Sequence, residues 1–135
     1  MVTHSDREPK NEEEIQKLLK VTFPAGYKIL GFKYVGGMDD CMFLKLSIPA
    51  ESFDAFWAAS PFKDGMDTTK LDSHFKKQEK LHLDWWDGET CLSRQIYDID
   101  LGSGITSKRE AAEIMICRDK ENQGEIVLYL FWFEV

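Results

Sequence analysis

The stretch from Ile126 to Phe133 constrains the fold more than any other part of the sequence. Its eight residues, IVLYLFWF, carry no charge and are apolar or aromatic at every position. Successive side chains of a strand point to opposite faces of a sheet, so a strand of this kind must be covered on both sides. A membrane-spanning helix would need about 20 apolar residues. We therefore expect residues 126–133 to form a central strand.

Other stretches show the periodicities of helices and strands. Residues 12–21 repeat isoleucine and leucine at helical spacing, and Asn11 stands at the position of an N-cap. Residues 49–59 begin with proline, which suits a first helical turn, and carry an aromatic stripe. Alternation, or enrichment in β-branched and aromatic residues, predicts strands at 27–35, 41–48, 94–101 and 111–118.

The segment 61–80 allows two interpretations. It is a loop throughout, or it contains a short helix at about 71–80. The residues that follow, 81–85, alternate like a short strand.

These elements predict an α+β fold: an antiparallel sheet of about five to six strands, with two to three helices packed on one face. The expected order is helix, strand, strand, helix, the segment 61–80, and then three or four strands. Short turns between neighbouring strands favour the antiparallel arrangement. The length of 135 residues suits a single domain, of which residues 1–11 are expected to be flexible.

The net charge of -7 is concentrated late in the chain. Residues 81–135 hold 11 acids against 5 bases, which gives -6. This balance argues against nucleic acid or an anionic membrane as the main partner, because phosphate binding needs clustered lysine and arginine. An ordinary solvated surface and an acidic docking surface for a basic partner both remain open. Five of the acids fall in one short stretch: Asp84, Asp87, Glu89, Asp98 and Asp100.

The cysteines Cys41, Cys91 and Cys117 lie far apart, are odd in number and form no CxxC pair. This pattern favours buried free thiols in a reducing compartment over a disulfide framework or a zinc site. The N-terminus contains no apolar leader segment. We expect a cytoplasmic protein, with a processed exported form as the alternative.

Catalytic and metal-binding motifs are absent from the sequence. It has no glycine-rich phosphate loop, no GxSxG and no HExxH. Cys91 could be paired with His74 or His82, but the spacing does not support a nucleophile and base. His82 and Asp84 supply two ligands where a stable metal site needs three or four. We therefore predict no catalytic residue, no metal and no cofactor, and we favour a binding protein over an enzyme.

Two groups of carboxylates have an ordinary and a functional interpretation. Gly36, Gly37, Asp39 and Asp40 lie between two expected strands, where aspartate commonly accepts backbone hydrogen bonds, and a functional turn is the alternative. Asp98 and Asp100 share one face of an expected strand. They form a solvated edge, or they bind a cation or an arginine if they are partly buried.

The pair Trp85-Trp86 is the least ordinary local feature. Neighbouring side chains of a strand point in opposite directions, so both indoles cannot enter one core. If Trp85 packs inside, Trp86 lies on the surface or beneath the segment 61–80. A surface tryptophan beside acids is typical of a protein-binding hot spot.

Several short motifs follow one another along the chain. They are Gly36-Gly37-Met38-Asp39-Asp40, Phe43-Leu44-Lys45-Leu46, Ile48-Pro49-Ala50-Glu51, Ala59-Ser60-Pro61-Phe62, Trp85-Trp86 and Leu128-Tyr129-Leu130. Over roughly residues 24–135 this order resembles a group of small uncharacterised bacterial proteins, some of them lipoproteins. The resemblance implies a hairpin with a Gly-Asp turn, a helix, a Trp-Trp segment and a final aromatic strand. The chain differs from the group in having Asp87-Gly88 where a proline often follows Trp-Trp, and it lacks a lipobox cysteine.

The leading hypothesis is a non-enzymatic bacterial protein of the immunity type, which neutralises a basic toxin domain through an acidic surface. One alternative is a small-ligand binder or minor hydrolase with a pocket between sheet and helices, using His82, Asp84 and Asp98. Another is a structural homo-oligomer, for instance a homodimer, formed through an exposed sheet edge. The partner-binding residues expected from sequence are Asp84, Trp86, Asp87, Glu89, Asp98 and Asp100.

Overall fold

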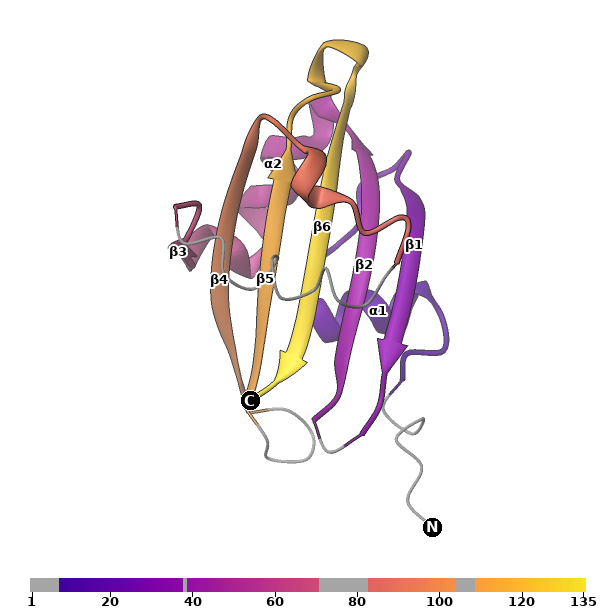
Figure 1. Ribbon diagram of the computed structural model, residues 1–135, viewed down its shortest axis with the longest axis vertical. Helices are drawn as coiled ribbons and strands as arrows, with labels where there is room; N and C mark the ends of the chain where they lie inside the picture. The colour runs from indigo at the N-terminus through magenta and orange to yellow at the C-terminus, as the bar shows by residue number, and fades with distance from the viewer. Residues whose placement is uncertain (1–7, 38, 71–82, 104–108) are drawn as a thin grey trace.

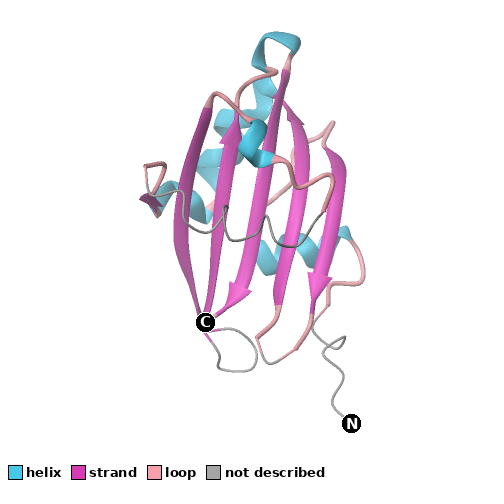
Figure 2. Ribbon diagram, viewed as in Figure 1, coloured by secondary structure: helices cyan, strands magenta, loops and turns pink. Residues whose placement is uncertain are grey.

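The structure is a computed structural model and describes residues 8–37, 39–70, 83–103 and 109–135. Within these residues, six antiparallel strands form one sheet, and two α-helices pack on one face of it (Figures 1 and 2). The α+β class and the helices on one face are as expected from the sequence. The elements are α1 (Glu12–Leu19), β1 (Lys28–Val35), β2 (Cys41–Pro49), α2 (Phe53–Ala59), β3 (Met66–Asp67), β4 (Arg94–Ser103), β5 (Arg109–Cys117) and β6 (Glu125–Glu134).

The sheet order is β1-β2-β6-β5-β4-β3, so β6 lies between β2 and β5. Leu130 is paired with Leu44 of β2 on one side and with Ile114 of β5 on the other. From Ile126 to Trp132 every residue of β6 is buried, whichever face it points to. The prediction of a central strand covered on both sides is therefore confirmed.

The helix-bearing face carries the larger core. Alternate residues of β2 and β6 point into it and meet side chains from both helices. Ile15 and Leu19 enter from α1, and Phe53 and Phe56 enter from α2. The side chain of Asn11 caps α1 by accepting a 2.9 Å hydrogen bond from the Glu14 amide, as the sequence indicated.

Both helices are shorter than expected. Lys20 adopts a left-handed conformation with φ of 59°, which ends α1 before Val21. The second expected helix is divided: a 3-10 turn, η2 (Ala50–Ser52), precedes α2. A further 3-10 turn, η3 (Pro61–Asp64), leads into β3.

Among the described residues, a chain segment without an α-helix covers the opposite face of the sheet. Residues 83–93, here called the strap, cross this face in front of β2 and β6 before β4 begins (Figure 1). The strap contains one 3-10 turn, η5 (Gly88–Thr90). The expected strand at 81–85 is wrong for residues 83–85, which lie outside the sheet in a turn. Residues 71–82, including the possible helix at 71–80, are outside the described part of the chain.

Among the described residues, no helix is both long and apolar enough to cross a lipid bilayer.

Candidate functional site

Two tryptophans attach the strap to the sheet. Trp86 is only 6% exposed, and its ring makes edge-to-face contacts with Phe43 and Tyr129 at centroid distances of 5.2 and 5.5 Å. Trp85 lies against Gly31 of β1, where a Cβ atom would fall 2.1 Å from the indole ring. Because the strap is a crossing segment and not a strand, both rings reach the same face.

Of the two positions that the sequence left open for Trp86, the surface position is wrong, and the ring is buried. The argument from strand alternation did not apply, since residues 83–87 are in turn and loop conformations. Trp86 belongs to a second core, formed with Phe43, Met115 and Phe131 on the strap face. Its role in the fold is to anchor the strap to the sheet.

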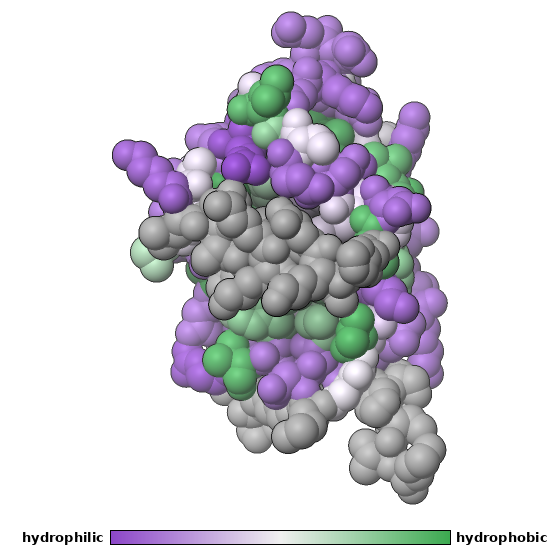
Figure 3. All heavy atoms as spheres, in the orientation of Figure 1, coloured by the Kyte–Doolittle hydropathy of each residue, from purple (hydrophilic) through white to green (hydrophobic). Residues whose placement is uncertain are grey.

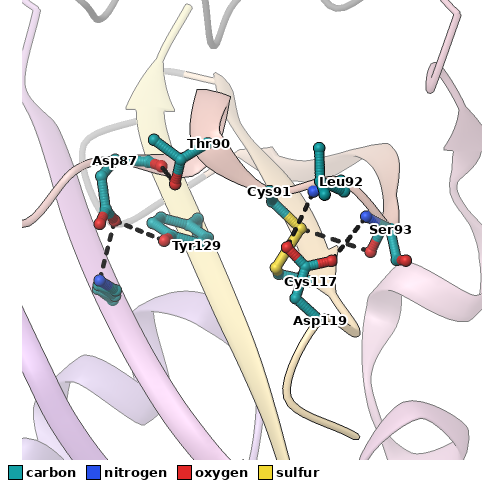
Figure 4. The surroundings of a disulfide bond; sticks show 9 residues. Asp87, Thr90, Cys91, Leu92, Ser93, Cys117, Asp119 and Tyr129 are labelled. Carbon is teal, nitrogen blue, oxygen red and sulfur yellow. Dashed lines mark hydrogen bonds and ion pairs between the residues drawn. A yellow bond between two sulfur atoms is a disulfide. The ribbon is translucent and has the colours of Figure 1, made fainter.

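Asp87 links the strap to two strands by polar contacts. One carboxylate oxygen accepts hydrogen bonds from Lys45 Nζ at 2.9 Å and from the Tyr129 hydroxyl at 2.6 Å (Figure 4). Burial alone would raise the pKa of Asp87, but these two hydrogen bonds and the Lys45 charge outweigh it and lower the pKa. The pKa of Tyr129 is raised, first by burial and then by Asp87, with Glu89 and Asp119 adding to the effect.

A disulfide between Cys91 and Cys117 joins the end of the strap to β5 (Figure 4). The expectation of three free thiols is wrong for this pair; of the three cysteines, Cys41 is the free one. Residues 26 positions apart in sequence become neighbours only because Arg94 and Cys117 are paired in the β4–β5 ladder. Burial and the nearby Asp40 raise the pKa of the Cys41 thiol.

Asp119 fixes the loop that follows the disulfide. Its two carboxylate oxygens accept hydrogen bonds from the backbone amides of Leu92 (2.9 Å) and Ser93 (2.8 Å) (Figure 4). These two bonds lower the pKa of Asp119. Sequence reasoning did not single out Asp119, because it lies in a polar hairpin loop where an aspartate is unremarkable.

Cys91, Cys117 and Asp119 also bring three potential metal-ligand atoms within 4.8 Å of one another. In this arrangement the two sulfur atoms are bonded to each other, and both oxygens of Asp119 accept backbone hydrogen bonds. The trio therefore has no thiolate to offer a metal while the disulfide is formed.

The acids expected to bind a partner fall into two groups. Asp84, Asp87 and Glu89 belong to the strap, where Asp84 and Glu89 are exposed. The view of this face in Figure 3 shows hydrophilic residues gathered at the end of the molecule that carries the β5–β6 hairpin. Asp119 lies in that hairpin between Arg118 and Lys120, and its carboxylate is hydrogen-bonded to the end of the strap.

Asp98 and Asp100 form a separate group on β4. Asp98 lies next to β3, and Thr68 Oγ1 donates a 3.5 Å hydrogen bond to it. Asp100 is paired with Arg109 and also accepts a hydrogen bond from the Gly102 amide. The backbone bond from Gly102, followed by Arg109, lowers the pKa of Asp100. An arginine partner was one of the two interpretations open for these acids.

In the turn between β1 and β2, an aspartate accepts hydrogen bonds that stabilise the turn, as aspartates in turns commonly do. Asp40 is buried and accepts hydrogen bonds from the Gly37 amide at 3.1 Å and from the Tyr34 hydroxyl at 2.6 Å. Its own amide donates to Glu134 of β6. Gly36 is half-buried, while Gly37 and Asp39 are exposed. Asp40 thus connects the turn to β6.

The structure does not assemble the small-ligand site suggested by sequence. Asp84 precedes Trp85, which packs on β1, whereas Asp98 is on β4, four strand spacings or roughly 19 Å away. His82 lies outside the described residues. An open groove of about 410 Å³ does exist, but it lies along the β3–β4 edge, where Asp98, Asp100 and Arg109 line it with Met66 and Phe133.

Acidification is expected to weaken the attachment of the strap. The pKa of Asp87 is lower in the folded than in the unfolded chain, so its contribution to stability is present above about pH 4 and is lost as pH falls further. Urea unfolding at a series of pH values should show this loss, and Asp87→Asn should make it shallower. An identical acid slope in Asp87→Asn and in the parent would contradict this assignment.

Fold and site together define an α+β sheet protein with a disulfide-bonded acidic strap across the face opposite its helices. No family model matches the chain, and neither curated proteins nor solved structures gave a match.

Proposed function

We propose that the chain is a non-enzymatic binding protein of the bacterial immunity type, which neutralises a basic protein domain through the acidic strap. The supporting observation is the charge of the strap: residues 83–93 contain Asp84, Asp87 and Glu89 but no lysine, arginine or histidine, and Asp84 and Glu89 are exposed. Asp119, from the β5–β6 hairpin, adds a further carboxylate where it is hydrogen-bonded to the strap. Such a local field favours a basic partner and accelerates its association.

The strap is also built as a rigid surface. The tryptophans, the Lys45–Asp87–Tyr129 contacts and the Cys91–Cys117 disulfide hold it at successive points along its length. A surface that is already ordered loses less conformational entropy when it binds. Rigidity and charge together support recognition of a folded protein partner.

The compartment forms part of the proposal. The sequence pattern favoured the cytoplasm, but disulfides are rare in reducing compartments. The Cys91–Cys117 bond supports a protein that works in an oxidising compartment, as the exported alternative allowed.

The test is direct titration of a defined basic protein. The probe is the purified product of the gene adjacent to the one for this chain, which the proposal requires to carry a net positive charge, and its binding kinetics are measured at low and at physiological salt. Reversing the two exposed strap acids, with Asp84→Lys and Glu89→Lys, should lower the association rate by about tenfold and reduce its dependence on salt. Co-expression of the parent chain should suppress the toxicity of the probe.

A matched control changes the same charge elsewhere. Glu13→Lys and Asp64→Lys reverse two exposed acids, in α1 and η3, whose partners are surface lysines. This pair should leave the association rate near that of the parent. Absence of binding to the basic probe, or equal loss in both pairs of variants, rejects the proposal.

A further inference from the structure

Leu92 is the most exposed of the large apolar side chains described. It is 92% exposed, whereas Leu30 is 43% exposed and the neighbouring Cys91 is buried. A single exposed leucine is ordinary on a protein surface. Leu92 is unusual because hydrogen bonds and a disulfide fix the backbone around it.

Four contacts fix the loop around Leu92. Asp119 accepts hydrogen bonds from the amides of Leu92 and Ser93, and the Arg118 amide donates a 2.9 Å bond to the Ser93 carbonyl. The disulfide anchors Cys91 immediately before it. In Figure 4 the backbone nitrogen of Leu92 faces Asp119, and its side chain points away from the disulfide. The fold thus presents an apolar side chain to solvent on a fixed backbone.

Carboxylates flank Leu92 in the strap and in the adjoining hairpin, whereas the guanidinium of the neighbouring Arg118 is paired with Glu121. Asp119 is bonded directly to the Leu92 amide, and Glu89 precedes Leu92 by three residues in the strap. Glu89 belongs to the strap and Asp119 is hydrogen-bonded to it, so both carboxylates lie on the strap face. An apolar centre with a polar rim is the usual arrangement of a protein–protein interface.

We propose that Leu92 is the apolar anchor of the partner-binding surface, and that the partner offers an apolar pocket bordered by lysine or arginine. This inference rests on the proposed function and specifies what the basic partner must contain. A leucine held in place loses little backbone entropy on insertion, while the acids around it select a pocket with a basic rim.

Leu92→Ala tests the anchor against the same basic probe, the product of the adjacent gene. Because the side chain is exposed in the free protein, the urea midpoint should not change. Affinity should fall by about 30-fold, which is the effect of a typical hot-spot residue. The change should appear in the dissociation rate and leave the salt dependence of association intact.

Leu30→Ala is the matched control, since it makes the same substitution at an exposed position on β1. It should leave affinity unchanged. If the Asp84→Lys, Glu89→Lys pair weakens binding but Leu92→Ala does not, the proposed function stands and the anchor is rejected. Equal losses in Leu92→Ala and Leu30→Ala also reject the anchor. If the parent chain does not bind the probe, both proposals fail.

Discussion

Trp86→Ala is expected to lower the free energy of unfolding by about 3–5 kcal/mol, the range for removing a large aromatic side chain from a core. Trp86 is 6% exposed and contacts Phe43, Trp85 and Tyr129. Its removal leaves a cavity between the strap and the sheet that rigid strands cannot fill. Urea unfolding followed by circular dichroism measures the loss.

Leu92→Ala provides the reference for this experiment, because it alters the strap without touching the core. We expect no change in its unfolding free energy. A loss of less than about 1 kcal/mol for Trp86→Ala would return Trp86 to the surface role that the sequence suggested. The comparison thus distinguishes Trp86, which anchors the strap to the sheet, from Leu92, which the strap exposes to solvent.

Breaking the Cys91–Cys117 disulfide has the second largest expected effect, about 2–4 kcal/mol. The bond restricts the unfolded chain over the whole span between the two cysteines. It also holds the end of the strap beside β5. Urea unfolding with and without reductant, compared with a Cys91→Ser, Cys117→Ser variant, measures the loss.

Cys41→Ser is the control for this reduction experiment. Cys41 is the free cysteine, so the variant should lose as much stability on reduction as the parent chain does. Thiol titration of the unfolded, unreduced parent should find one thiol, and three after reduction. Three thiols before reduction would show that the bond does not form. Thiols can also be labelled at the moment the source cells are lysed. One labelled thiol per chain would show that the disulfide is present in the compartment in which the protein works.

The sequence was sufficient for the fold class and for most of the helices and strands, because local signals decided them. The apolar run at 126–133 required a central strand, and alternation in β4 put Tyr97 and Ile99 on the helix face and Ile96 on the other. Asn11 marked the start of α1. These signals depend on neighbours in the chain, and periodicity reports them directly.

The candidate site depended on contacts between distant segments. Asp119 and Leu92 are brought together by the β4–β5 pairing, and the same pairing makes the Cys91–Cys117 bond possible. Neither contact has a local signature. The rule that neighbouring side chains point to opposite faces was applied to Trp85 and Trp86. It holds for strands and does not apply to a segment that crosses over the sheet.

By itself, the sequence determined the sheet, the helices on one face and the position of excess negative charge, because side-chain periodicity and composition are properties of the chain alone. Only the tertiary structure decided which acids share a surface, that Trp86 is buried while Leu92 is exposed, and which cysteines join. Those properties depend on how the strap lies over β2 and β6 and on the register of β4 with β5. Both are set by packing between residues far apart in the sequence.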